Sequence, residues 1–305
     1  VKGFTHDMPD VPPELRGTYA GMAHPAAIEH LLSLGVTAVE LLPIHAAFSE
    51  AFLLKRGRTN YWGYSTLSYF APEPSYATAA SQAAGPQAVL DELRGMISLL
   101  HKAGLEVIMD VVYNHTCESG VDGPSLSLRG LGNLEYYLHS PHRPAQYFDV
   151  TGTGNTVDFR STRAVQLALD SLRYWAGEVG IDGFRFDLAV TLGRNASEFH
   201  ARHPLLVGMA TDPVLSGVKL IAEPWDIGPG GWRTGDFPLP FHDWNDRYRG
   251  TVRSFWLHDA SEMSKGRPGS DLRDLATRLS GSADTFSYGE CPGGRGPLGS
   301  VNFVT

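Results

Sequence analysis

The sequence predicts an α/β fold, a (β/α)8-type TIM barrel, from three observations. Short segments rich in Val, Ile and Leu alternate with amphipathic helical segments, a pattern typical of a parallel sheet with helical cover. Polar residues recur at the end of one apolar segment after another, as they do at the mouth of a barrel. The chain has 305 residues, of which 42% are apolar. This length and composition suffice for one barrel core and make a second full domain unexpected. We therefore expect one barrel domain over residues 1–305.

The helices are predicted from apolar residues that recur every three or four positions. They cover residues 25–34, 86–103 and 162–176, and a glycine follows each of the first two, where glycine commonly ends a helix. Buried strands are predicted over residues 36–42, 105–112, 183–186, 219–222 and 300–305. The N-terminal residues 1–5 read as the tail of a further strand, so the strand over 105–112 counts as the third.

Two stretches interrupt this alternation. Residues 113–160 are rich in Gly, Pro, Ser and His and lack a sustained period, and loops of this length in compact domains are usually functional. We expect an excursion subdomain over 113–160, inserted after the third strand and lying over the barrel mouth. Residues 224–244 form a second turn-rich stretch.

The two ends of the sequence predict a barrel that is incomplete at both ends. The first strand is cut short at Val1, and no strand follows 300–305 to close the barrel. We expect an open sheet edge, exposed apolar faces and a parent protein longer than this chain.

Composition excludes several classes of function. The net charge of −8 and the pI near 5.8 disfavour binding to nucleic acid or to anionic membranes, both of which need clustered Lys and Arg. No apolar stretch approaches the roughly 18 residues that a membrane span requires, and the N-terminus is not a signal peptide. Cys117 and Cys291 cannot form a disulfide framework, which agrees with a reducing cytoplasm.

Three carboxylates follow apolar segments: Asp110, Asp187 and Glu223. The C-terminal ends of parallel strands open into loops rather than into the packed interior, so chemistry is expected at these positions. Arg185 lies two residues before Asp187, so both side chains share one side of their strand. A fixed guanidinium there would favour the ionised form of Asp187.

Three segments resemble signature segments of the α-amylase superfamily of glycoside hydrolases, in the right order and strand context. They are DVVYNH at 110–115, GFRFD at 183–187 and AEPW at 222–225. The segments NYWGY at 60–64, EPWD at 223–226 and GPGGW at 228–232 are similar to the glycogen debranching and isoamylase branch of that superfamily. The resemblance extends over the whole chain as part of a catalytic domain.

The resemblance implies hydrolysis of α-1,6 branch linkages in glycogen or limit dextrins, a step of glycogen catabolism. It implies that Asp187 is the nucleophile and Glu223 the acid/base, in a sugar pocket lined by Tyr64, Asp110, Asn114, His115, Arg185, Trp62 and Trp225. Retaining glycosidases need two carboxyl groups roughly 5–5.5 Å apart, one ionised and one protonated, and Asp187 and Glu223 are the right residue types for this.

Several of these residues have an alternative structural interpretation. Asp110 is equally well explained as a buried hydrogen-bond acceptor, and aromatic clusters are usually packing. Because the 60–64 segment reads as a loop, we favour Tyr64 as a sugar platform and leave Trp62 as core or rim. His115, beside Asn114 at a strand exit, is interpreted as a neutral donor to a sugar hydroxyl rather than as a structural histidine.

Other functions have weaker support in the sequence. The same barrel residues serve α-1,4-acting amylases and glucanotransferases, and an α-glucan-binding module without catalysis is the alternative of another class. In the family that the chain resembles, a His-Asp pair follows the strand at 300–305; this sequence ends before it. We therefore expect the chain alone to be catalytically impaired and prone to aggregation.

The sequence carries no motif that requires a bound metal ion or phosphate. Calcium is possible through Asn114 and the excursion, but no acidic cluster demands it. The pairs His139/His142 and His200/His203 lack a His-Glu-x-x-His pattern and are expected to be solvated. The glycine-rich segments 152–154 and 293–296 are expected to be turns, because a phosphate loop needs a following Lys and Ser or Thr.

Overall fold

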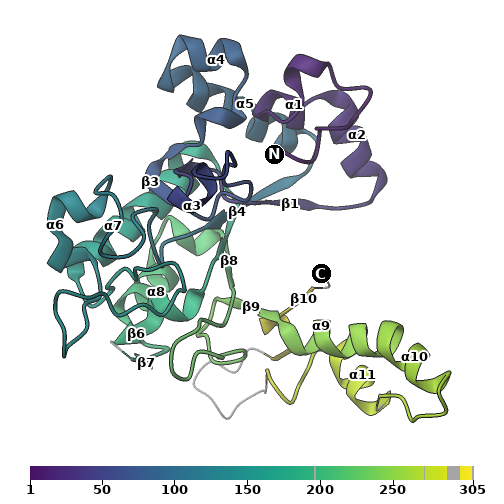
Figure 1. Cartoon of the computed structure of the whole chain (residues 1–305). Helices are drawn as coiled ribbons and strands as arrows, with labels where there is room; N and C mark the ends of the chain where they lie inside the picture. Colours follow the sequence, from purple (N-terminus) through teal and green to yellow (C-terminus); the bar gives the residue numbers. More distant parts are fainter. Residues whose placement is uncertain (196, 271, 287–295, 304–305) are drawn as a thin grey trace.

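The computed structural model describes residues 1–195, 197–270, 272–286 and 296–303. A six-stranded sheet runs through it in the order β1-β4-β5-β8-β9-β10, and every neighbouring pair is parallel (Figure 1). The strands are β1 (Ala38–Leu41), β4 (Glu106–Val111), β5 (Gly183–Phe186), β8 (Lys219–Ala222), β9 (His242–Asn245) and β10 (Ser300–Asn302). Within the described residues β1 and β10 are the two edges of this sheet.

Of the principal helices, one precedes the first strand and the other three lie between strands in the sequence. They are α2 (Pro25–Ser33), α5 (Pro86–Lys102), α7 (Thr162–Arg173) and α8 (Pro204–Thr211). The first three confirm the helices predicted at 25–34, 86–103 and 162–176, although the last turns of the third, Tyr174–Val179, are π-helical. Gly35 and Gly104 adopt φ of 71° and 80°, a backbone conformation that glycine tolerates and that ends both helices.

Shorter elements fill the connections. The helices are α1 (Tyr19–Met22), α3 (Ala51–Leu54), α4 (Ala79–Ala84), α6 (Leu128–Tyr136), α9 (Asp246–Arg253), α10 (Asp259–Met263) and α11 (Leu272–Leu279). The π-helix Ser254–His258 joins α9 to α10, and 3-10 turns lie at Pro13–Leu15, Pro74–Tyr76, Ala189–Gly193, Leu215–Gly217 and Gly296–Gly299. Two antiparallel pairs complete the set: β2 (His45–Ala47) with β3 (Thr66–Pro72), and β6 (Arg194–Asn195) with β7 (Glu198–Phe199).

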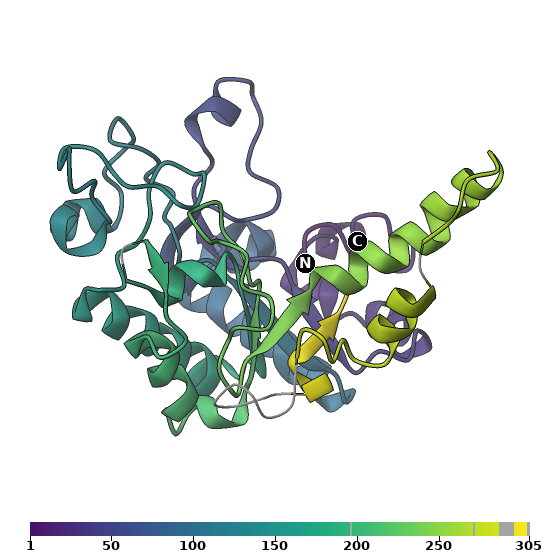
Figure 2. The ribbon, with the colours of Figure 1, turned by 90° about the horizontal axis from the view of Figure 1, so that it is seen from below.

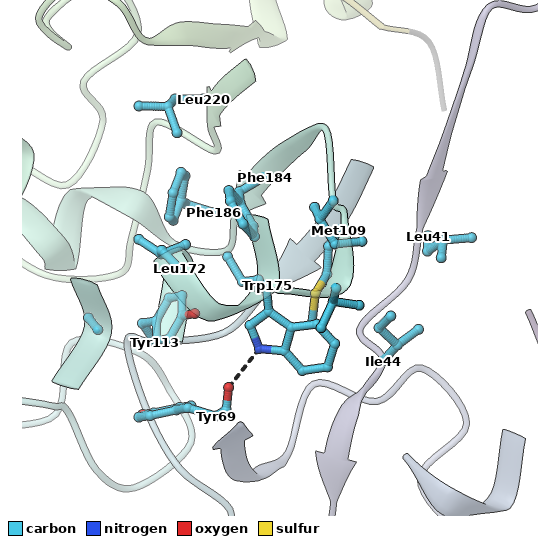
Figure 3. Close-up of a cluster of buried hydrophobic side chains, with 14 of the residues drawn as sticks. Leu41, Ile44, Tyr69, Met109, Tyr113, Leu172, Trp175, Phe184, Phe186 and Leu220 are labelled. Atoms are coloured by element: carbon cyan, nitrogen blue, oxygen red, sulfur yellow. Dashed lines mark hydrogen bonds between the residues drawn. The ribbon is translucent and has the colours of Figure 1, made fainter. Parts of the chain in front are cut away.

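The sheet has one apolar face, which packs against the helices. Its alternate residues include Met109, Phe184 and Leu220, which belong to one buried cluster with the helical Leu172 and Trp175 (Figure 3). Trp175 is fully buried, and its indole N–H donates a 2.7 Å hydrogen bond to the carbonyl of Tyr69 on β3. The helices therefore cover only one face of the sheet, and the intervening residues point to the other face.

The opposite face carries the polar residues. Asp110, Arg185 and Ile221 are register partners across β4, β5 and β8, and none of them belongs to the apolar cluster. Period-two alternation continues past the strand ends, so Asp187 and Glu223 follow Arg185 and Ile221 on this same face. One face of the sheet thus forms the core, and the other assembles the charged groups.

The N-terminal strand prediction is wrong. Residues 2–7 form turns, closed by hydrogen bonds such as His6 N–H to the Gly3 carbonyl at 3.3 Å. A strand needs a paired neighbour, and these residues satisfy their backbone locally instead. The strand that carries Asp110 is consequently the second in the described parallel sheet, β4 following β1.

The two turn-rich stretches also contain regular elements that the sequence pattern did not reveal. Residues 113–160 include α6, which has a non-helical residue, Gly132, in its middle. Residues 224–244 run into β9, which begins at His242. Both elements are short or interrupted, so their periodicity is too brief to stand out.

The helices α9, α10 and α11 extend away from the sheet as an arm (Figures 1 and 2). The arm carries the exposed apolar side chains Trp256 and Leu257. None of the helices in the described ranges is long and apolar enough to cross a membrane.

Candidate active site

The register of three parallel strands brings the predicted carboxylates together. Asp110 on β4 is the register partner of Arg185 on β5. The ladder continues beyond the strands, where the backbone N–H of Asp187 donates to the Val111 carbonyl and that of Glu223 donates to the Phe186 carbonyl, both at 3.0 Å. Asp187 and Glu223 therefore leave adjacent strands side by side.

Arg185 binds all three carboxylates. Its guanidinium lies 2.9 Å from Asp110 Oδ1, 3.2 Å from Asp187 Oδ1 and 3.1 Å from Glu223 Oε1. The arginine side chain is 3% exposed and that of Asp110 is 2% exposed, whereas Asp187 and Glu223 keep 13% and 12%. The cation is therefore enclosed, while the two carboxylates at the strand ends can be reached from outside.

Glu223 has an environment that favours its protonated form. Burial and the neighbouring charge of Asp187 raise the pKa of Glu223 to about 7, although Arg185 and hydrogen bonds from Leu188 and Trp225 oppose the rise. The Leu188 hydrogen bond runs from the backbone N–H to Oε2 at 2.7 Å. Glu223 is thus a carboxyl group that can carry a proton near neutral pH.

Asp187 is surrounded by donors. Besides Arg185, the side-chain amide of Asn114 donates to Asp187 Oδ2 at 2.9 Å and to its carbonyl oxygen at 2.7 Å. Donors of this kind fix the orientation of the carboxyl group. The two neighbouring carboxyl groups, Asp187 and Glu223, therefore have different surroundings.

Asp110 and Tyr64 form a hydrogen-bonded pair beside Arg185. The Tyr64 hydroxyl donates a 2.5 Å hydrogen bond to Asp110 Oδ2, and Arg185 holds both oxygens of the same carboxylate. Burial raises the pKa of Asp110, and the charge of Arg185 opposes the rise. Asp110 thereby connects the half-buried Tyr64 ring to the guanidinium that binds Asp187 and Glu223.

His115 is buried, and both ring nitrogens have partners inside the protein. Nε2 donates to the Tyr64 carbonyl at 2.8 Å, and Nδ1 contacts Oδ1 of Asn114. In this arrangement the histidine supports two other predicted site residues, Tyr64 and Asn114. The side-chain amide group of Asn114 donates to Asp187, and its side-chain oxygen contacts His115. Asn114 would have to give up these contacts in order to bind calcium.

The two predicted tryptophans lie differently. Trp62 is 65% exposed on the 60–64 loop, with its ring edge against Tyr64 at a centroid distance of 6.3 Å. Trp225 is half-buried, and its ring lies 6.4 Å from Phe303 and 5.9 Å from the Arg249 guanidinium. Trp62 belongs to the rim beside Tyr64, and Trp225 lies on the side of β8 that faces β9 and β10.

Sequence reasoning missed two contributors to this site. Trp244 on β9 places its ring 4.2 Å from the Arg185 guanidinium, whose Nε has no hydrogen-bond partner among the described residues. Leu188 supplies the N–H that holds Glu223, from a left-handed backbone conformation with φ of 41°. Trp244 lies in a stretch interpreted as loop, and nothing local in the sequence marks a leucine for a left-handed turn.

One expectation about the histidine pairs is wrong. His203 is 1% exposed, and its Nδ1 accepts the backbone N–H of Leu205 at the start of α8. His200 and His142 are exposed, as expected. A search of the described residues found no group of three or more His, Cys, Asp or Glu side chains that would hold a metal ion. The segment 293–296 lies largely outside the described residues.

The chain is similar to curated glycogen enzymes along its whole length. It is 47% identical over all 305 residues to the glycogen operon protein GlgX homolog of Mycobacterium tuberculosis, and 46% identical to the glycogen debranching enzyme of Cronobacter sakazakii. The chain spans 40% and 43% of these two relatives. No family model matches the chain.

Solved structures with a similar fold include pullulanases. The pullulanase of Anoxybacillus sp. LM18-11 in complex with maltotetraose superposes with a TM-score of 0.71 at 25% identity, covering 93% of this chain and 41% of its own. The pullulanase of Paenibacillus barengoltzii in complex with maltohexaose and α-cyclodextrin gives 0.73 at 26% identity, covering 99% of this chain and 47% of its own. The fold is therefore the TIM-barrel-like one of these enzymes.

Proposed function

We propose that this chain, a homologue of part of the glycogen debranching enzymes, carries the catalytic carboxylates that hydrolyse α-1,6 branch linkages in glycogen or limit dextrins. The observation that carries the proposal is the single guanidinium of Arg185, which contacts Asp187 and Glu223 while both remain partly exposed. The proposed setting is a (β/α)8-type barrel, with residues 113–160 as an excursion at its mouth.

The first step forms a covalent bond between the sugar and the enzyme, as in retaining glycosidases. Asp187 attacks the anomeric carbon as the C–O bond to the departing sugar breaks, and Glu223 gives its proton to that oxygen. Arg185 and Asn114 support this assignment because both donate hydrogen bonds to the Asp187 carboxyl group and hold it in place. The raised pKa of Glu223, about 7, supports its role as the donor.

The second step releases the sugar. Glu223, now ionised, takes a proton from water as the water oxygen attacks the anomeric carbon, and the bond to Asp187 breaks. Both carboxyl groups return to their starting protonation states. Two inversions at the same carbon leave the product with the α configuration of the substrate.

The remaining predicted residues are assigned to holding the sugar. Tyr64 offers a half-buried ring fixed from below by Asp110, which suits stacking against the apolar face of a sugar. Trp62 extends this aromatic surface outward, since its ring edge contacts Tyr64. We assign Asp110, His115 and Asn114 to fixing Tyr64, Arg185 and Asp187 rather than to the chemistry itself, and Trp225 to the wall beside Glu223.

The linkage is proposed from the names of the relatives. Glycogen debranching enzymes and pullulanases stand among the similar proteins, so a branched α-glucan is the favoured substrate. The barrel carboxylates are shared by α-1,4-acting enzymes, and linkage depends on the shape of the surrounding loops. The linkage therefore has to be tested on a branched substrate.

The test is product analysis with the intact protein. A branched limit dextrin is incubated with the enzyme, released chains are separated by size, and the anomeric configuration is followed by proton NMR during the first minutes. Release of linear chains as α anomers is expected. Shortening of linear maltooligosaccharides would favour an α-1,4-acting amylase or glucanotransferase, β anomers would overturn the retaining mechanism, and binding without release would favour a binding module.

A further inference from the structure

A buried ion pair joins the two loops that follow the carboxylate-bearing strands. Arg194, at the start of β6 in the connection after β5, places Nε 2.6 Å from Oδ2 and Nη2 2.6 Å from Oδ1 of Asp226, in the loop after β8. The arginine side chain is 3% exposed and the aspartate 0%. A two-pronged contact of this type fixes the orientation of both partners as well as their separation.

The pair is fastened to both loops by further hydrogen bonds. Thr191 donates to Asp226 Oδ2 at 3.3 Å, and the backbone N–H of Gly228 donates to Oδ1 at 2.9 Å. Arg194 Nη2 also donates to the Pro229 carbonyl at 3.1 Å. Asp226 thus bonds the segment that carries Arg194, through Thr191, and Arg194 bonds the loop that carries Asp226, through Pro229.

The same two loops meet again at the carboxylates. Leu188 N–H donates to the Glu223 side chain at 2.7 Å, and Ala189 N–H donates to the Glu223 carbonyl at 3.0 Å. Asp187 and Glu223 therefore lie at one end of a closed ring of contacts, with the Arg194–Asp226 pair at the other. Asp226 is three residues after Glu223, so little chain separates the ion pair from the proposed acid.

We propose that Arg194 and Asp226 are positioning residues that set the placement of Glu223 relative to Asp187. The proposal rests on the proposed function, because it concerns the geometry of that reaction. A buried ion pair adds little net stability compared with an apolar pair of equal volume, so stability alone does not account for it. Displacing a reacting group by about 1 Å costs as much as a hundredfold in rate, which gives such a pair a function.

The test compares two arginines in the intact protein. The pair is altered by three substitutions, which are Arg194→Lys, Arg194→Gln and the near-isosteric Asp226→Asn. Arg173→Lys and Arg173→Gln are the controls, because Arg173, whose side chain is 41% exposed, contacts Asp212 at 2.6 Å in an ion pair between α7 and the end of α8. Each variant is assayed on limit dextrin and on α-maltosyl fluoride, with the folded fraction determined by near-UV circular dichroism.

The expected result separates positioning from folding. Fluoride needs little protonation to depart, so a displaced Glu223 should lower kcat on limit dextrin about tenfold more than kcat on the fluoride, with KM changed less than about threefold. Arg194→Lys should recover part of the activity that Arg194→Gln loses. The Arg173 variants should retain the wild-type ratio between the two substrates.

Two other outcomes would overturn the inference. Equal losses on both substrates, once corrected for folded fraction, would mean that the pair serves only stability. An unchanged kcat in Asp226→Asn together with Arg194→Gln would mean that the pair does not affect the carboxylates. Failure of the proposed function looks different, because the wild-type protein would then release no chains from limit dextrin, and Glu223→Gln would leave the substrate ratio unchanged.

Discussion

The backbone N–H of Leu188 donates a 2.7 Å hydrogen bond to Oε2 of Glu223, so the residue after Asp187 holds the neighbouring carboxyl group. Leu188 has φ of 41° and ψ of 50°, a left-handed conformation that costs a non-glycine residue about 1–2 kcal/mol. Such strain persists where surrounding contacts enforce it, and here it turns an N–H toward Glu223.

Asp187→Asn should lower turnover of limit dextrin by several orders of magnitude, because an amide cannot form the glycosyl-enzyme bond. The Asn side chain has nearly the same shape, so glucan binding measured by calorimetry should persist. Near-normal turnover in a carefully purified variant would remove Asp187 from the role of nucleophile.

Glu223→Gln should slow the hydrolysis of substrates with poor leaving groups far more than that of aryl or fluoride glycosides. Turnover of limit dextrin should fall by a factor of roughly 10²–10⁴. The pH profile gives a second check. A donor must be protonated, so with a pKa of about 7 the wild-type rate should fall as pH rises through about 7, and the variant should lose this limb. Equal losses on all substrates would contradict the role.

The same raised pKa predicts an effect on stability. Between the ordinary value of 4.5 and about 7, the folded protein binds more protons at Glu223 than the unfolded chain does, so stability falls as pH rises through this window. Glu223→Gln should flatten that part of the curve of unfolding free energy against pH. A curve with unchanged slope would argue against the raised pKa.

Tyr64→Ala should weaken glucan binding by roughly 1–3 kcal/mol and leave the fold intact, because the ring is half-buried and would act as the sugar platform. Tyr64→Phe is the matched control. It keeps the ring and removes only the hydrogen bond to Asp110, so most of the binding should remain. Unfolding of Tyr64→Ala would favour a packing role instead.

Glu118→Gln should destabilise the excursion at 113–160. Glu118 is fully buried and accepts the backbone N–H groups of Leu126, Ser127 and Arg129 and the Tyr137 hydroxyl. An amide would direct its NH2 group at some of these donors, at a cost of about 1–3 kcal/mol in the free energy of unfolding. Denaturant melts should show this loss, with the exposed Asp122→Asn as a control of no effect.

The pH dependence of Glu118 has the opposite sign to that of Glu223. Burial raises the pKa of Glu118, but hydrogen bonds from Tyr137 and three backbone N–H groups outweigh burial and hold it below its ordinary value. Its contribution to stability is therefore present above pH 4.5 and is lost as the pH falls further. Glu118→Gln should weaken this acid-side loss in thermal melts.

Much of the site was predictable because its signals are local. A buried strand is a short apolar run, and each of these three runs has a carboxylate at or beside its C-terminal end, so Asp110, Asp187 and Glu223 could be placed near the ends of successive strands from the sequence alone. Alternation along one strand likewise put Arg185 beside Asp187. The helices at 25–34, 86–103 and 162–176 followed from their apolar period, and the structure confirms them.

Only the tertiary structure decided the contacts between segments far apart in the chain. Trp244 stacks on Arg185, Arg194 pairs with Asp226, and His203 is buried at the start of its own helix, although no local pattern in the sequence predicts these contacts. Residues 2–7 formed turns where an apolar strand end was predicted. The sequence determined which residues leave each strand on its charged face, because alternation depends on neighbours two residues away. The structure decided which loops meet there and how the two carboxyl groups differ, because ion pairing, burial and strand pairing depend on partners that the chain brings together only on folding.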